Sequence, residues 1–304
     1  MIAHASVVEH VVVFIGGLVA IGVYGAAWLR TGGSNWRLAS WCGGVGMVLI
    51  ATSPPIESMA LERFSGHMIQ HLLMIVVAAP LLVLAAPVTT ILTAWPSLRR
   101  TSPTERQVAG WWHRWAPIVA PVSFIVVLFV THLTGIYDLA LDNRLVHDLE
   151  HIAYLASAVA LWAAVRGVGR SAAVTRVGSV FAVIAGTAML GVVLLTASAP
   201  LVPTYAEQFG DAAAIDDQRV AASIMWVSGM AMTLPLLLLA VWRWATTEER
   251  IAVAAERLER APRSAPARSA PAASLAQRPS RRPAADGSRR RSDRRPTRPP
   301  PSAR

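Results

Sequence analysis

The chain contains no lysine: all 28 of its basic residues are arginine. Without a lysine amine it cannot form a Schiff base to retinal or pyridoxal, and it cannot carry a Walker A phosphate loop. Cys42 is the only cysteine, so an intrachain disulfide and a cysteine-rich metal site are both excluded. Charged residues make up 15% of the 304 residues, against about 25% in soluble domains. This composition argues against a soluble globular protein.

Hydrophobic residues, by contrast, make up 54% of the chain and are gathered into long runs. A bilayer-spanning helix needs about 20 mostly apolar residues. The sequence therefore predicts an all-α, polytopic integral membrane helix bundle with about seven transmembrane helices in residues 1–244. Pro80 and Pro87 are expected to kink the third of these helices without ending the span. The predicted spans are residues 7–29, 37–53, 67–93, 116–135, 146–166, 177–198 and 218–243.

The arginines of this region also predict its orientation, because cytoplasmic loops of membrane proteins are enriched in Arg and Lys. The loops that follow spans one, three and five hold nine arginines. The loops that follow spans two, four and six hold only Arg63, Arg144 and Arg219. We therefore expect the N-terminus outside the cell and the C-terminus in the cytoplasm.

The net charge of +10 comes entirely from the C-terminal part of the chain. Residues 1–242 hold 12 arginines and 12 acids, which cancel, whereas residues 243–304 hold 16 arginines and six acids. Residues 245–262 alternate charges at helical spacing, which predicts a short cytoplasmic helix. Residues 263–304 are Arg/Pro-rich and cannot bury a core, so they are expected to form a disordered cytoplasmic tail. Such a tail favours contact with anionic inner-leaflet lipid, and no nucleic acid partner is expected.

Seven of the eight histidines lie at or near the predicted outer boundary of the membrane, and only His113 falls in a cytoplasmic loop. The orientation was assigned from arginine alone, so this clustering is an independent observation. Ionisable groups at membrane depth are functional candidates by default. The seven outer histidines are His4, His10, His67, His71, His132, His147 and His151.

Five of these histidines have a spacing suited to a metal site. His67 and His71 are four residues apart, so both rings lie on one helix face, and His147 and His151 repeat the pattern on another span. Two such pairs, with His132 on a third helix, are sufficient to hold an ion inside a bundle. We predict that these five histidines ligate a metal. The alternative is that they are interfacial residues at helix ends.

The expected metal is copper. Neutral imidazole suits copper, zinc, iron and nickel, and thioether sulphur shifts the preference towards copper(I). Met59, Met68 and Met74 lie close to the first histidine pair in the sequence.

Acidic residues follow the histidines in the sequence, and three interpretations of them stay open. They can fix histidine tautomers through hydrogen bonds, form a docking surface for a cation, or cap helices. For Asp216 and Asp217 we favour the helix cap at the start of the last span. The acids between spans four and five are Asp138, Asp142, Asp148 and Glu150.

Several separated motifs, in order, resemble those of the CtaG family, the seven-span assembly factors of caa-type cytochrome c oxidase. Thr131 stands where the family usually has tryptophan. The resemblance covers roughly residues 7–244 and excludes the tail. The motifs are HMIQHLL (67–73), Ala79–Leu82, Ala86-Pro87, THL (131–133), Tyr137-Asp138, HDLEH (147–151) and the run from Tyr205 to Trp226.

This resemblance implies a non-catalytic protein of the bacterial plasma membrane that supplies copper to the oxidase copper centre beside the haem. Its partners would be cytochrome c oxidase subunits and the lipid bilayer. The metal site assigned to the five histidines rests on their spacing, and not on the family.

Three other functions remain as alternatives. A membrane di-iron enzyme would also use His-x-x-x-His pairs, but the His-x-x-His-His boxes of such enzymes are absent and their ligands face the cytoplasm. A haem protein would need axial histidines such as His71 with His132 or His151, and this leaves the paired spacing unexplained. A copper transporter would need an ionisable relay across the membrane, and no ionisable residue lies mid-membrane along spans three to five after His71.

The predicted orientation can be tested with fusions to a reporter that is active only outside the cytoplasm. Fusion after residue 62 or 142 should give an active reporter, and fusion after residue 105 or 172 should give a silent one. The reverse pattern would place the histidines in the cytoplasm and revive the di-iron alternative.

Overall fold

The structure is a computed structural model that describes residues 7–99, 103–166 and 173–260. Within these ranges the chain is helical and has no β-strand. The predicted disordered tail, residues 263–304, lies outside the described residues, as does His4. In chain order the elements are α1 (Val7–Thr31), α2 (Asn35–Ala51), α3 (Pro54–Glu62), α4 (Phe64–Leu72), the π-helix η1 (Leu73–Ala78), α5 (Ala79–Ala85), α6 (Pro87–Ala94), the 3-10 turn η2 (Pro96–Leu98), α7 (Pro103–Leu133), α8 (Ile136–Asp142), α9 (Arg144–Arg166), α10 (Ala173–Thr196), α11 (Pro203–Phe209) and α12 (Asp211–Arg260).

The helices confirm the predicted all-α fold with about six to seven candidate spans. Six segments are long and apolar enough to cross a membrane, and a seventh is obtained if α2 and α3 form one broken span. The helix α2 has 17 residues, which is short for a bilayer, and α3 continues from it after a bend of 48°. The orientation of the termini stays a prediction.

The third span is interrupted where the sequence places its two prolines. The π-helix η1 directly precedes Pro80, which has no N–H and whose ring crowds the carbonyl one turn earlier, at Val76. Ala86 adopts a left-handed conformation with φ 50°, which ends α5 before Pro87; the proline disfavours the right-handed helical region at this position. The span therefore consists of α4, η1, α5 and α6 in series.

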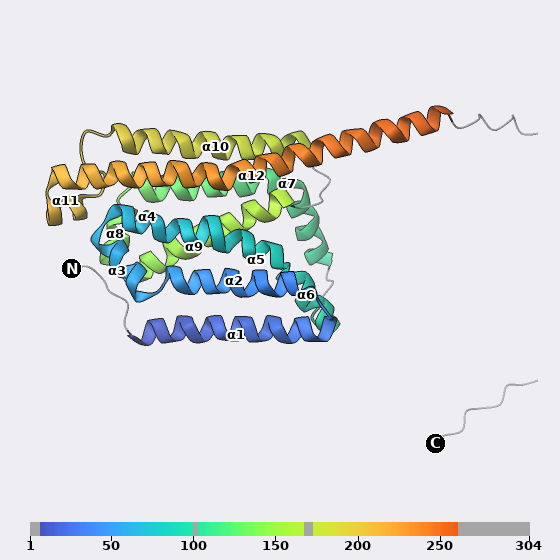
Figure 1. The fold of residues 1–304 in the computed structure, drawn as a ribbon, viewed down its shortest axis with the longest axis horizontal. Coiled ribbons are helices and arrows are strands. Elements are labelled where there is room, and N and C mark those ends of the chain that lie inside the picture. The colour runs from blue at the N-terminus through green and yellow to red at the C-terminus, as the bar shows by residue number, and fades with distance from the viewer. Residues whose placement is uncertain (1–6, 100–102, 167–172, 261–304) are drawn as a thin grey trace, which may run out of the picture. The chain divides into compact units, whose positions relative to one another are not determined.

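Figure 1 shows how these segments are arranged in the first part of the chain, up to Ala255. The third span lies between α2 and α9, and α9 also contacts α7. Helices α10 and α12 meet through small residues, since a Cβ added at Gly229 would lie 3.8 Å from Thr187. The largest buried cluster joins side chains from α4, α7, α9, α10 and α12, so the core surrounds the inner face of α4 and α9.

Three short helices, α3, α8 and α11, cover the end of the bundle at which α4 and α9 begin (Figure 1). The Asp138 carboxylate on α8 accepts hydrogen bonds from the backbone N–H of Thr204, at 3.1 Å, and from its hydroxyl, at 2.9 Å. The Tyr205 hydroxyl on α11 donates to the Ala60 carbonyl at 2.7 Å. These bonds hold the three short helices against one another.

The last helix corrects one expectation from the sequence. Helix α12 begins at Asp211, so Asp216 and Asp217 lie within it and do not cap it. The Asp217 carboxylate instead accepts hydrogen bonds from the backbone N–H of Ser65, at 3.0 Å, and from the Ser65 hydroxyl. Asp217 therefore fixes the first turn of α4, two residues before His67. The helix continues through residues 245–260, and the chain divides into two units after Ala255.

Gly66, next to His67, gives the first prediction about stability. A Cβ at this position would overlap the Met59 backbone carbonyl of α3, so Gly66→Ala should separate α3 from α4. We expect a loss of stability of about 1–3 kcal/mol, measured by thermal unfolding in detergent. Gly46→Ala on α2 is the matched control, because nothing lies within 4 Å of its added Cβ. The control should be neutral or slightly stabilising, since alanine favours a helix over glycine by about 1 kcal/mol. Equal melting of both variants would contradict the close approach of α3 and α4.

Candidate metal centre

Four of the five predicted histidines meet at the contact between α4 and α9. The rings of His67 and His71 lie 4.4 Å apart on α4, and those of His147 and His151 lie 4.3 Å apart on α9, measured between centroids. Across the two helices, His67 is 5.2 Å from His147, and His71 is 5.4 Å from His151. All four side chains are buried, with His67 fully inaccessible. The two pairs of the sequence thus form one compact cluster.

A carboxylate completes this cluster. Glu150 on α9 is buried, and its Oε2 lies 3.6 Å from His67 Nε2. Two overlapping sets have all their ligand atoms within 4.8 Å of one another: His67 with His147 and His151, and His67 with His71 and Glu150. From the sequence the role of Glu150 stayed open between a partner for histidine, a docking surface for a cation and a helix cap, although its position three residues after His147 already places it on the same helix face.

Several polar atoms of the cluster lack hydrogen-bond partners among the described residues. Both ring nitrogens of His147, Nε2 of His151 and both carboxylate oxygens of Glu150 are buried without a partner. Each such atom costs about 1–3 kcal/mol relative to a satisfied one. His67 Nε2 and His71 Nε2 contact each other at 3.0 Å. Convergent, desolvated nitrogen and oxygen donors of this kind fit a bound metal cation, which would satisfy several of them together.

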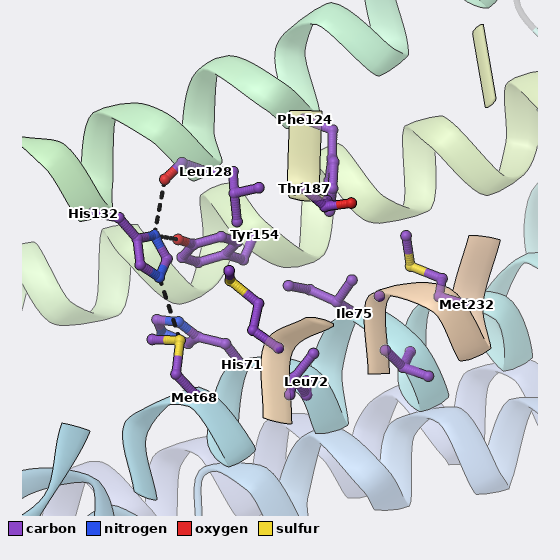
Figure 2. Close-up of a pocket in the computed structure, with 13 residues that line it drawn as sticks. Met68, His71, Leu72, Ile75, Phe124, Leu128, His132, Tyr154, Thr187 and Met232 are labelled. Carbon is purple, nitrogen blue, oxygen red and sulfur yellow. Dashed lines mark hydrogen bonds between the residues drawn. The ribbon is translucent and has the colours of Figure 1, made fainter. Parts of the chain in front are cut away.

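His132 does not join either set of ligand atoms. It lies on α7, where its Nδ1 is 2.8 Å from the Leu128 carbonyl and its Nε2 is 3.3 Å from the Met68 sulphur. Figure 2 shows His132 and Met68 facing each other at the wall of a small pocket that His71 also lines. The predicted five-histidine site is therefore divided into a cluster of four and a separate neighbour.

Three tyrosines that the sequence analysis did not single out as site residues surround the histidines. The rings of Tyr137 and His67 are 4.6 Å apart, and those of Tyr154 and His71 are 4.3 Å apart. Tyr205 lies 6.4 Å from Tyr137, again between ring centroids. Burial raises the pKa of Tyr137 and Tyr205 well above that of an exposed tyrosine, so both hydroxyls are neutral. They exclude water without adding charge.

An ion-pair network lies beside the cluster and links α1, α3 and α9. The Glu57 carboxylate pairs with Arg144 and also lies 2.8 Å from His10 Nε2. Arg144 pairs in addition with Asp148 at 3.0 Å. Asp148, one of the acids expected near the histidines, is thus engaged with arginine. Glu150, two residues further along α9, faces the cluster instead.

Helix bundles commonly build metal sites in their cores from side chains on facing helices, and the histidine and glutamate cluster has that position in this bundle. The chain belongs to the family of cytochrome c oxidase caa3 assembly factors, whose model matches residues 7–247. The match confirms the resemblance found in the separated motifs.

Curated relatives are found in mycobacteria. The uncharacterized proteins Mb0105 of Mycobacterium bovis and MT0111 of Mycobacterium tuberculosis are each 26% identical over 259 residues, covering 78% of this chain. The uncharacterized protein ML1998 of Mycobacterium leprae is 23% identical over 256 residues, covering 77% of this chain. The alignments cover 38–39% of these relatives, so the chain spans about two fifths of their length. No solved structure matches.

The unpartnered carboxylate predicts how Glu150→Gln should behave. Without metal, the variant should melt at the wild-type temperature or above it, because an amide costs less to bury than a carboxylate. Added metal should stabilise the wild type more than the variant, since the wild type keeps one more ligand. Binding at 100 times the Kd corresponds to about 2.7 kcal/mol. The measurement is thermal unfolding in detergent, with metal and with a chelator.

The exposed residue Glu62 provides the matched control. Glu62→Gln should change stability by no more than about 0.5 kcal/mol under both conditions. A metal-free Glu150→Gln protein that melts well below the wild type would show that protein contacts alone satisfy the carboxylate.

Proposed function

We propose that this chain binds copper at the cluster formed by His67, His71, His147, His151 and Glu150 and delivers it to cytochrome c oxidase during assembly. The observation that carries the proposal is the meeting of these five side chains between α4 and α9, where they form two overlapping sets of three ligands that share His67, with the ligand atoms of each set within 4.8 Å of one another. Membership of the family is the reason to propose cytochrome c oxidase as the recipient. The nitrogen and oxygen donors of the cluster are the reason to propose a metal.

The donors favour a transition metal over calcium or magnesium, which prefer oxygen ligands. Imidazole nitrogen is a good ligand for copper, and the neighbouring thioether of Met68 supports copper in its monovalent form. The Glu150 carboxylate can neutralise part of the charge of the bound ion in a site that excludes water.

The location of the cluster supports a protein that accepts an ion and hands it on. All five side chains lie within two helical turns of the starts of α4 and α9, near the short covering helices. In the predicted orientation this end faces the outside of a bacterial plasma membrane. Beyond His71, residues 72–94 contain no ionisable side chain, so the span offers no polar relay to the other side.

One observation favours a second candidate, a binuclear metal oxidoreductase. The two ligand sets share His67, and one of them contains a carboxylate; di-iron bundles likewise combine histidine and carboxylate ligands from facing helices. Iron bound in place of copper after purification would support this candidate. A haem site is disfavoured, because the ring of His71 packs against Tyr154 and His67 at 4.3 and 4.4 Å and leaves no slot for a porphyrin there.

The proposal predicts that His67→Ala/His71→Ala loses the copper that the detergent-purified wild type retains. Removing two ligands leaves a shell that the remaining donors cannot complete. In a bacterium lacking its own copy of the gene, His71→Ala or His151→Ala should lower oxidase activity while haem content and subunit levels stay near normal. Added copper should partly restore the weaker variants by mass action.

His113→Ala is the control, because His113 lies 19 residues before His132 on α7, about 28 Å along the helix. It should keep both its copper and the oxidase activity. If the cluster variants retain full copper occupancy and full oxidase activity, the histidines are packing residues and the proposed function is wrong.

A further inference from the structure

The position of the proton on His132 is fixed by its surroundings. Its Nδ1 lies 2.8 Å from the Leu128 carbonyl oxygen, which can only accept a hydrogen bond. The proton of the neutral ring must therefore be on Nδ1. The Tyr154 and Thr131 hydroxyls lie 3.1 and 3.2 Å from the same nitrogen and are hydrogen-bonded to each other. Both hydroxyls can make hydrogen bonds without displacing the bond from His132 Nδ1 to the Leu128 carbonyl.

This tautomer leaves a lone pair on His132 Nε2, and the lone pair points at sulphur. The Met68 Sδ is 3.3 Å away and, as a thioether, carries no hydrogen. Two acceptors therefore face each other with no proton between them, and both side chains are at most 3% exposed. A cation bound to both atoms resolves this. Metal bonds to nitrogen and sulphur of about 2.0 and 2.3 Å, the values for zinc, add up to more than their separation, so one ion can contact both.

The pocket beside this pair is suited to a soft ion. Its volume is about 30 Å³, close to that of one water molecule, and its remaining wall is almost entirely apolar. Met225 and Met232 of α12 also line it, so three thioethers from two helices surround the space. Figure 2 shows Met68 and His132 on one side of the pocket and Met232 on the other. Thioether is a soft ligand, and soft ligands favour monovalent copper.

We propose that Met68 and His132 form a second copper(I) site, separate from the histidine and glutamate cluster and adjoining it. His71 connects the two, because its Nε2 contacts His67 while its ring lines the pocket. This inference rests on the proposed function and adds a second binding site for the same cargo. An ion that moves from the histidine and glutamate cluster to the second site leaves the ligands of the cluster. It gains the imidazole of His132 and the thioether of Met68. Copper stays monovalent, and no electron or proton is transferred.

The test uses the full chain in detergent under anaerobic conditions. Copper(I) affinity is measured by competition with a chromophoric copper(I) chelator, and zinc(II) affinity is measured separately to probe the histidine and glutamate cluster. Copper X-ray absorption reports sulphur ligation. The variant is Met68→Leu, which nearly conserves volume. Its control is Met74→Leu, because Met74 is equally buried six residues later but does not line the pocket.

Met68→Leu should weaken the binding of the copper(I) ion held at the second site by roughly 10- to 100-fold or more, since even residues outside the ligand shell cost that much, and leave the copper of the histidine and glutamate cluster in place. It should remove the copper–sulphur signal and leave zinc affinity within about twofold, while Met74→Leu changes neither metal. Unchanged copper(I) affinity in Met68→Leu overturns the second site and leaves the proposed function standing. Equal losses of zinc and copper(I) also overturn it, because Met68 would then only position the cluster. A wild-type protein that binds no copper overturns both proposals.

Discussion

The main physical constraint on the structure is the free-energy cost of burying imidazole and carboxylate groups between apolar helices. Four histidines and Glu150 lie where α4 and α9 pack, and the described residues leave several of their polar atoms without partners. The surrounding structure holds these groups in place, since Asp217 anchors the start of α4 and the Glu57–Arg144 pair anchors the start of α9. Neutral tyrosines exclude water from the remaining sides. Such an arrangement is unfavourable for stability alone, and the proposed ion would satisfy these groups together.

Much of this arrangement can be predicted from the sequence, because two sequence patterns determine it. Apolar runs locate the spans, and the spacing of four residues places each histidine pair on one helix face. His132 could not be placed in the same way. The direction of a single histidine depends on how its helix is rotated about its own axis, and packing of α7 against its neighbours determines that rotation. Glu150 shares the helix face of His147, but its place in the cluster could not be predicted. A carboxylate near the start of a helix can also cap that helix or fix a histidine tautomer.

The irregular parts of the fold show a similar limit. Pro80 and Pro87 mark where the third span must deviate from a regular helix. The sequence does not say whether the chain responds with a wider turn, as in η1, or with a left-handed residue, as at Ala86. Both responses depend on which neighbours can accept the displaced backbone. The same holds for α2 and α3, where the break between them falls at Thr52 and Ser53.

The pairing of α4 with α9 also has a consequence for the order of biosynthesis. His71 and His147 are separated by 75 intervening residues, which include all of α7. A nascent chain that has inserted only its first four spans carries the donors of α4 and lacks those of α9. An ion that needs both helices can therefore be captured only after the fifth span has entered the bilayer. Loading of the proposed centre would therefore follow the entry of α9 and report that α4 and α9 have paired.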